Sequence, residues 1–446
     1  MIVSGMKVAT FVRFIFSVVF FALTIACPTQ SLRAQGLDRI ERERVISMLN
    51  IVKKDLTSNY YDPNFRGMDV EARFNAAEEK VKQATSLGQA FGIVAQTLLD
   101  LNDSHTIFIP PRRPETINYG WQMQMIGDKC YVVAVKPGSD AEAKGLKEGD
   151  LILAVERFKP TRKEFWKMSY YYNTLSPRPG LRLSVQSPDG QSRELELKAK
   201  VKSGQIVRDL TRELEINDYI REIEDDFRAG RHRYYENIDG AFVWKMPAFD
   251  LSDDGVDEMM GKAKKASALI LDLRGNGGGA QTTLLRLIGN FFDKDLKVAD
   301  VKERKETKPL IAKTRGKSAY TGKLVVLIDS ESGSSSELFA RVIQMEKRGT
   351  VIGDVSAGAV MRARRYRHDL GASTLVGFAV IITNADVIMP DGKSLENVGV
   401  NPDELLGPTA EDMAAHRDPV LARAAELLGV KLDSAKAGTL FPIEWK

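Results

Sequence analysis

The feature that most constrains the fold of this chain is an alternation of strand-like and helical segments in its C-terminal part. From about residue 241, short apolar runs alternate with segments whose apolar residues recur at helical spacing. The expected strands are 241–245, 268–273, 324–328, 351–352 and 378–382, and the expected helices are 282–292, 337–345 and 419–428. Such alternation is typical of α/β domains, so we expect residues 241–446 to form one.

Two regions with other sequence patterns precede this domain. Residues 37–58 and 90–101 have helical spacing, which predicts a helical region over 36–115. Short β-like runs punctuated by turn residues follow, which predicts a small β domain over 118–200 and then a linker over 201–240. These β-like runs are 130–135, 151–155 and 181–185. The predicted fold class is therefore α+β, with several domains.

Composition excludes several classes of protein. The chain has 446 residues, with 64 basic and 60 acidic side chains and a formal net charge of +4. A charge so near neutrality argues against nucleic acid or an acidic membrane as the main partner. Two cysteines cannot build a disulfide scaffold or a four-cysteine zinc site. We expect an ordinary enzyme-sized chain, and the oligomeric state stays open.

The N-terminus has the pattern of an export signal. Lys7 and Arg13 precede a run of 13 uncharged, mostly apolar residues, 14–26. A membrane-spanning helix needs about 20 apolar residues, so this run suits the core of a signal peptide better than a membrane anchor. We predict that residues 1–35 are a signal peptide and that the mature protein is periplasmic or secreted, with no stable membrane span. The alternative is a lipoprotein acylated at Cys27.

The middle of the chain resembles a known binding module. Residues 133–155 read VAVKPGSDAEAKGLKEGDLILAV, which is similar to the core of a bacterial-type PDZ domain. PDZ domains hold an extended peptide as an added strand at an open sheet edge. The resemblance places Tyr119, Gly120 and Trp121 in the peptide-binding loop. The alternative is a small β-barrel that only spaces two other domains, in which Gly120 has a turn role.

Three loops contain residues that could carry chemistry. The loop 332–337 reads SGSSSE and joins an expected buried strand directly to an expected helix. A serine at such a turn lies beside free backbone N–H groups, which favour negative charge, as a serine nucleophile and its oxyanion require. The other two loops are 103–105, which contains His105, and 396–403, which begins with Glu396.

Each of these loops also has an ordinary structural interpretation. Ser334 followed by Glu337 is the pattern of a capping box, in which the serine satisfies a backbone N–H of its own helix. A lone histidine is more often a hydrogen-bonded structural residue than a base, and Glu396 by itself is a loop carboxylate.

The order of the motifs resembles a protease family. The segments 101–106, 271–279, 332–337 and 396–403 occur in the order seen in the tail-specific, C-terminal-processing serine proteases, with a PDZ module between the first two. In the Ser–Lys branch of that family a lysine lies 25 residues beyond the nucleophile, but this chain has Ala359 there. The chain therefore looks like the tricorn-related branch, which uses Ser, His, a second Ser and Glu.

The resemblance implies a role for each site residue. Ser334 would be the nucleophile, His105 the general base, and Glu396 would orient the base through Ser104. The oxyanion would be held by the N–H of Ser335 and by a glycine N–H from the pair Gly277 and Gly278. The resemblance also implies a crotonase-like ββα-spiral catalytic domain and hydrolysis of unfolded or extended polypeptides, with no metal and no cofactor.

Other interpretations stay open at this stage. The absent lysine is also compatible with a catalytically inactive peptide- or ligand-binding protein on the same fold. The pattern Gly275-x-Gly277-x-x-Ala280 after a strand is a weak dinucleotide-binding signal. A basic run at 362–367 is usually a solvated face, and we hypothesise that Arg362 or Arg364 meets a substrate carboxylate.

Overall fold

The computed structural model describes residues 37–113, 115–203, 233–371, 376–443 and 445. The predicted signal peptide and most of the predicted linker lie outside these residues. Within the described residues, no helix combines the length and the hydropathy that a membrane crossing requires.

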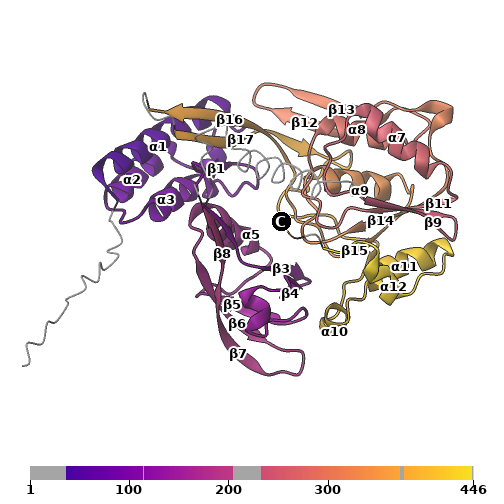
Figure 1. Ribbon diagram of the computed structural model, residues 1–446. Helices are drawn as coiled ribbons and strands as arrows, with labels where there is room; N and C mark the ends of the chain where they lie inside the picture. The colour runs from indigo at the N-terminus through magenta and orange to yellow at the C-terminus, as the bar shows by residue number, and fades with distance from the viewer. Residues whose placement is uncertain (1–36, 114, 204–232, 372–375, 444, 446) are drawn as a thin grey trace, which may run out of the picture. The chain divides into compact units, whose positions relative to one another are not determined.

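Three helices form the N-terminal region. They are α1 (Arg39–Asn59), α2 (Val70–Lys82) and α3 (Leu87–Leu99), and they begin after N-cap side chains that accept a hydrogen bond from the first turn, Asp38, Asp69 and Ser86. Their apolar stripes meet in one cluster with Phe378, Val380 and Ile382 of a long C-terminal strand. The predicted helices 37–58 and 90–101 are confirmed within a few residues, and Figure 1 shows them beside that strand.

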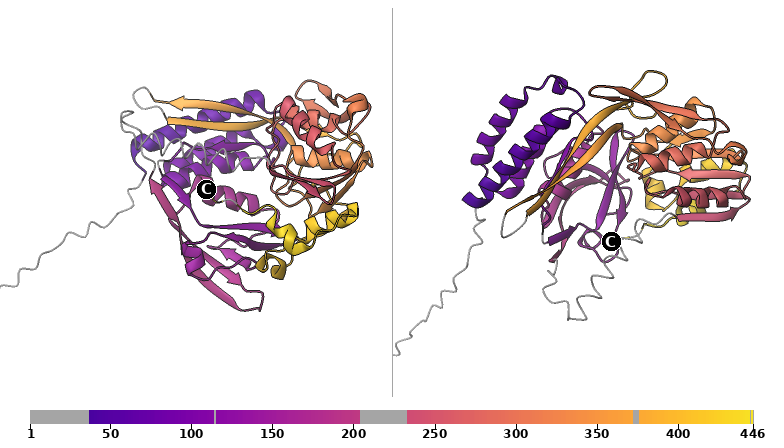
Figure 2. Two further views of the ribbon diagram at one scale, coloured as in Figure 1. Left: turned by 45° about the vertical axis from the view of Figure 1, so that its right-hand side comes forward. Right: turned by 90° about the horizontal axis from the view of Figure 1, so that it is seen from above.

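That strand belongs to a five-stranded antiparallel sheet assembled from distant parts of the chain. Its strands are β1 (Ile107–Ile109), β12 (Leu296–Glu303), β13 (Thr307–Ala312), β16 (Met361–Leu370) and β17 (Val376–Ile388), in the order β1-β17-β12-β13 with β16 also on β17. Ile107 pairs with Ile381, so a strand that begins two residues after His105 is held by the C-terminal part of the chain. Figure 2 shows β16 and β17 (orange) alongside the N-terminal helices (indigo).

A second antiparallel sheet occupies the region of the predicted β domain. It comprises β3 (Trp121–Ile126), β4 (Lys129–Val135), β5 (Leu151–Val155), β6 (Gly180–Gln186) and β7 (Ser192–Lys198) in sequence order. Two short helices, α4 (Asp140–Ala143) and α5 (Phe165–Tyr170), accompany it, and a π-helical turn (Tyr171–Leu175) extends α5. A two-stranded ribbon, β2 (Glu115–Asn118) with β8 (Lys200–Ser203), lies at its two ends in the sequence. The three predicted strands are confirmed; the PDZ assignment stays a prediction.

The C-terminal α/β region is built on a six-stranded, mostly parallel sheet. Its order is β18-β15-β14-β11-β10-β9, with bounds β9 (Arg233–Ile238), β10 (Ala241–Lys245), β11 (Ala268–Asp272), β14 (Lys323–Ile328), β15 (Thr350–Gly353) and β18 (Glu404–Leu405). Only β9 is antiparallel to its neighbour. The central strands are buried on both faces, which explains their continuous apolar sequences.

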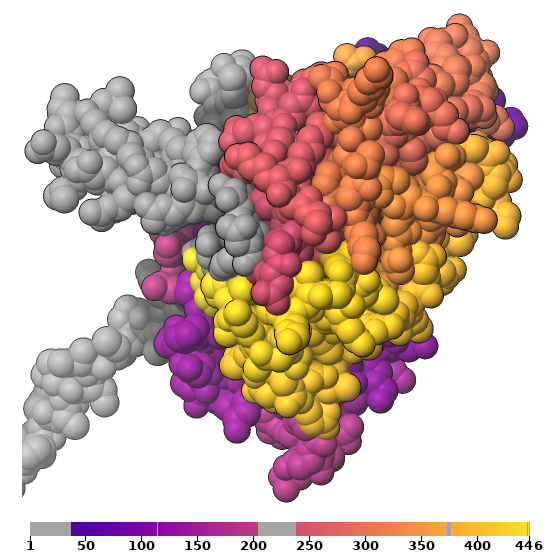
Figure 3. Space-filling view, turned by 90° about the vertical axis from the view of Figure 1, so that its right-hand side faces the viewer, coloured from indigo at the N-terminus to yellow at the C-terminus, as the bar shows by residue number. Residues whose placement is uncertain are grey.

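Helices cover both faces of this sheet. On one face lie α7 (Asp253–Ala263), α8 (Gln281–Gly289) and α9 (Ser335–Met345), which share a core with alternate strand residues such as Leu271 and Val326. On the other lie α11 (Pro419–Leu428) and α12 (Ser434–Thr439), which share a core with Ile270 and Val325; α10 (Ala410–Ala414) precedes them. Figure 3 shows the C-terminal segment (yellow) at the surface. The crotonase-like arrangement stays a prediction.

Candidate active site

Ser334 lies at a strained turn between a buried strand and a helix. β14 ends at Ile328, α9 begins at Ser335, and Ser334 has φ of 52°, a value that few residues other than glycine adopt. Ser334 and Glu337 form a capping box, in which the Glu337 carboxylate accepts a hydrogen bond from the Ser334 N–H at 2.9 Å. The capping box that the sequence pattern predicts is therefore present at the start of α9. Strained backbone of this kind often accompanies functional sites.

His105 is held in a hydrogen-bonded relay with Glu396. The Ser104 Oγ lies 2.7 Å from Glu396 Oε2 and 2.7 Å from His105 Nδ1, and the Ser104 N–H donates to Glu396 Oε1 at 2.8 Å. An ionised Glu396 can only accept, so Ser104 donates its proton to Glu396 and accepts from His105 Nδ1–H. This assignment leaves Nε2 of His105 as the unprotonated nitrogen, which is the tautomer that a general base needs.

Asp103 fixes the loop that carries the relay. Its buried carboxylate accepts hydrogen bonds from the His105 N–H at 2.8 Å, from the Thr106 N–H at 3.1 Å and from the Thr383 hydroxyl at 2.7 Å. Because Thr383 is in β17, the loop is bonded to the five-stranded sheet as well as paired through β1. The sequence analysis did not single out Asp103 or Thr383, since their contact joins residues 280 positions apart.

Burial affects the titration of the relay. It lowers the pKa of His105, and the Asp103 carboxylate opposes this effect only in part. It also raises the pKa of Glu396, against the opposing hydrogen bonds from Ser104 and Val360. A histidine with a lowered pKa is neutral at neutral pH, so it can accept a proton there.

The loop 356–360 joins the serine turn to the relay. Ala359, which stands where the Ser–Lys branch has its lysine, accepts a hydrogen bond from the Ser334 N–H at 2.9 Å through its carbonyl oxygen. The N–H of the next residue, Val360, donates to Glu396 Oε2 at 2.9 Å. Two neighbouring residues thus contact the Ser334 turn and the carboxylate of the relay. Among the hydrogen bonds of the described residues, none joins Ser334 to His105, and such bonds are often long in unliganded sites.

The Glu337 carboxylate holds this loop in place through several hydrogen bonds. Besides the Ser334 N–H, this buried carboxylate accepts from the Ser356 hydroxyl at 2.6 Å, the Gly358 N–H at 2.8 Å and the Ala359 N–H at 2.9 Å. Burial raises the pKa of Glu337 to about 7, although these hydrogen bonds favour its ionised form. The capping-box pattern identified Glu337 as a helix cap, but its three bonds to the 356–359 loop had no signal in the sequence.

The glycine loop packs directly against the serine turn. A Cβ at Gly278 would lie 2.6 Å from Ser334 Cβ, so only glycine fits there. The Gly278 N–H donates to the Asn276 side chain at 2.8 Å, which occupies one of the three predicted oxyanion donors. Two predicted donors remain, Gly277 and Ser335, and Ser335 is the first residue of α9, whose N–H has no acceptor within the helix.

The residues predicted to bind peptide are engaged internally. Gly120 donates its N–H to the Asn118 side chain at 2.9 Å, and a Cβ at Gly120 would lie 2.6 Å from Ser139 Cβ. Trp121 is buried in the core of the β domain, and the Tyr119 hydroxyl donates to the Tyr172 carbonyl oxygen at 3.2 Å. The turn role of Gly120 thus has direct contacts in its favour.

Two further observations concern substrate binding by arginine and metal binding. Arg362, one of two arginines expected to meet substrate, instead donates to Glu303 at 2.6 Å and to Asn384 at 3.1 Å. Across the described ranges, no group of three or more His, Cys, Asp or Glu residues is placed to hold a metal ion.

Comparison with known proteins identifies similar peptidases. Residues 243–406 match the model of peptidase family S41. A tail-specific protease of Haemophilus influenzae is 28% identical over 326 residues, which are 68% of this chain and 44% of that protein. A probable CtpA-like serine protease of Staphylococcus haemolyticus is 21% identical over 379 residues, 83% of this chain and 66% of that one. The chain thus spans about half to two thirds of the length of these relatives.

Solved structures agree at the level of the fold. Mature CPAF superposes with a TM-score of 0.61 at 15% identity, covering 87% of this chain and 96% of that one. The photosystem II D1 C-terminal processing protease superposes with a TM-score of 0.50 at 18% identity, covering 89% of this chain and 99% of that one.

Proposed function

We propose that this chain is an exported serine endopeptidase that hydrolyses unfolded or extended polypeptides. Ser334 is the nucleophile, His105 the general base, and Ser104 and Glu396 orient the base. The observation that carries the proposal is the Glu396–Ser104–His105 relay, which is bonded through Val360 to the loop that contacts the Ser334 turn. The names of the relatives suggest that the cleaved sites lie near the carboxy-terminal tails of proteins.

The proposed reaction is an acyl transfer to water. The Ser334 Oγ attacks the peptide carbonyl carbon while His105 Nε2 takes its proton, and the Ser104–Glu396 pair stabilises the imidazolium that forms. The oxyanion accepts hydrogen bonds from the N–H groups of Ser335 and Gly277. His105 then gives the proton to the leaving amine. A water molecule, deprotonated by His105, attacks the acyl carbon, the bond from this carbon to the Ser334 Oγ breaks, and His105 returns the proton to that oxygen.

Substrate delivery and compartment are part of the same proposal. The β3–β7 sheet would act as a PDZ-like module that takes an extended peptide at a sheet edge. Residues 1–35 would direct export, and acylation at Cys27 is the alternative to a soluble mature protein.

Active-site labelling tests the chemistry. We expect a fluorophosphonate to label the chain at Ser334, and labelling to disappear in Ser334→Ala and His105→Ala. Lys347→Ala, which removes a lysine near the end of α9, should label like the wild type. If the wild-type chain does not label while a structured fold is verified by circular dichroism, the serine is not activated, and an inactive peptide-binding protein becomes the better description.

A further inference from the structure

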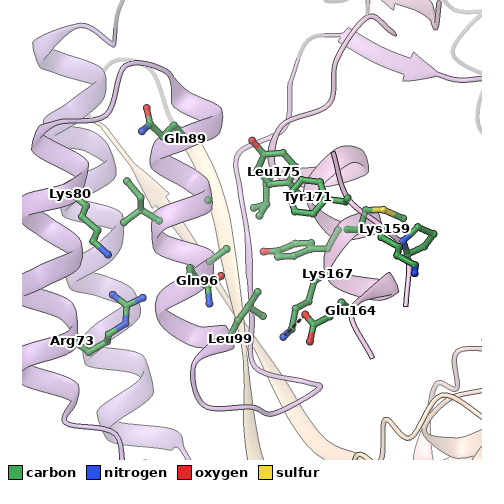
Figure 4. A pocket seen from close by; sticks show the side chains of 17 residues that line it. Arg73, Lys80, Gln89, Gln96, Leu99, Lys159, Glu164, Lys167, Tyr171 and Leu175 are labelled. Carbon is green, nitrogen blue, oxygen red and sulfur yellow. Dashed lines mark ion pairs between the residues drawn. The ribbon is translucent and has the colours of Figure 1, made fainter. Parts of the chain in front are cut away.

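A cavity of about 460 Å³ lies outside the candidate active site, between α3 and the segment that contains α5. A stripe of α3 forms one wall, with Gly92, Gln96 and Leu99 at helical spacing. Tyr171 and Leu175 of the π-helical turn face it from the other wall (Figure 4). None of the candidate catalytic residues lines the cavity, and its size is within the range of small-molecule sites.

Gly92 is the residue that keeps this cavity open. A Cβ at this position would have a single neighbour within 4 Å, the Tyr171 ring at 3.8 Å, so the space beside it is unfilled. Helix interiors disfavour glycine by about 1 kcal/mol relative to alanine. Gly92 therefore leaves room at a position where a larger side chain would suit the helix better.

The charge around the cavity is predominantly positive. Four cationic side chains line it, and the one lining carboxylate, Glu164, is paired with Lys167 at 2.9 Å. Arg73 is paired with Asp100 at 2.5 Å. Lys80 and Lys159 have no ion pair among the described residues, and both are exposed. Walls that are mostly apolar, with Gln89 and Gln96 as polar exceptions, together with unpaired cations suit a ligand that is apolar along its length and anionic at one end.

We propose that this cavity binds a single-chain amphiphile with an anionic head, of the long-chain carboxylate class. The alkyl chain of the ligand lies between the α3 stripe and the π-helical turn, and its carboxylate is near Lys80 or Lys159. This site is independent of the proposed peptidase chemistry.

Calorimetric titration of the full chain with decanoate, and with uncharged 1-decanol, tests the proposal. Gly92→Leu fills the cavity and should weaken decanoate binding at least tenfold. Gly261→Leu is the matched control, because Gly261 is an exposed glycine within α7 and a Cβ added there would meet nothing within 4 Å. The affinity of this variant for decanoate should stay within twofold of the wild-type value. The double variant Lys80→Ala, Lys159→Ala should weaken decanoate binding about tenfold and leave 1-decanol binding unchanged.

Three results would overturn the proposal. The first is no saturable decanoate binding by the wild type, and the second is equal binding by the two leucine variants, which would place any site elsewhere. The third is displacement of decanoate by an acidic, apolar peptide at a much lower concentration, which would identify a peptide site instead. Thermal unfolding of each variant verifies that a lost signal reflects the cavity and not a lost fold.

Discussion

At the scale of single residues, the site depends on the direction of two hydrogen bonds. Glu396 accepts from Ser104, and Ser104 in turn accepts from His105 Nδ1, so the proton of the imidazole is held on the side of the relay. Burial keeps the ring neutral by lowering its pKa.

The titration of His105 should have its midpoint below the ordinary value of 6.5. Burial disfavours the charged imidazolium, so protonation requires a lower pH than in a solvent-exposed histidine. Peptidase activity that needs the neutral ring is then retained at neutral pH and lost as the pH falls through this midpoint. NMR of the histidine ring protons of Ser334→Ala measures this midpoint directly, and the loss of one signal in His105→Ala assigns the His105 resonance. A midpoint above 6.5 would contradict the assigned burial.

Replacing Ser104 should lower kcat far more than it changes KM. Ser104→Ala removes both the acceptor for His105 and the donor to Glu396, so we expect kcat to fall about 10²- to 10⁴-fold. Ser104→Thr keeps a hydroxyl and should recover much of the loss, as steady-state kinetics on a peptide substrate will show. Equal kinetics for the alanine variant and the wild type would remove Ser104 from the relay.

At the scale of elements, the glycine loop and the serine turn are packed as one unit. Gly278 has φ of 102°, and its missing side chain allows Ser334 to approach, whereas a Cβ added at Gly277 would meet no atom within 4 Å. Strand β14 and helix α9 position one side of this contact and β11 the other. The two glycines therefore have different tolerances to substitution.

Gly278→Ala should be destabilising and Gly277→Ala should not. The first puts a methyl group 2.6 Å from Ser334 Cβ at a backbone conformation that alanine disfavours, so we expect the free energy of unfolding to fall by about 1–3 kcal/mol. The second should change it by less than about 0.5 kcal/mol. Urea unfolding of both variants makes the comparison, and similar values for the two would show that the loop relaxes around the added methyl group.

At the scale of the whole molecule, the β3–β4 hairpin is bonded to the loops that frame Ser334. The Gln124 side chain donates to Asp329 at 2.6 Å, just before the serine turn. Arg162, in the same β domain, donates to Asp354 at 2.9 Å and to the Val355 carbonyl oxygen. The β domain therefore supports the candidate site from outside the α/β region.

Arg162→Ala should weaken both stability and catalysis. It removes hydrogen bonds to a nearly buried carboxylate, so we expect the free energy of unfolding to fall by about 1–3 kcal/mol and kcat to decrease as the 354–360 loop loosens. Arg182→Ala is the control, because the Arg182–Glu196 pair is exposed and contributes at most about 1 kcal/mol. If both variants match the wild type in unfolding and turnover, this contact does not support the site.

Elements that depend on local interactions were predicted more accurately than contacts between residues far apart in the sequence. β5, β10 and α11 have the predicted bounds, because alternation, helical spacing and a leading proline are local signals. The arginine-rich run is exposed at Arg364, Arg365 and Arg367, as a solvated face would be, and it also forms β16, which pairs with β17. Its strand conformation depends on pairing with β17, which the local charge pattern of a single segment does not reveal.

The sequence by itself determined the local pieces of this protein: buried strands, capped helices, the serine at a strand-to-helix turn, and the histidine and glutamate loops. Only the tertiary structure decided that Ser104 meets Glu396, 292 residues away, and that Ala359 and Val360 contact the serine turn and that carboxylate. The physical reason is that these hydrogen bonds depend on the pairing of β1 with β17 and on the buried Glu337 carboxylate, which act only once the whole chain is folded.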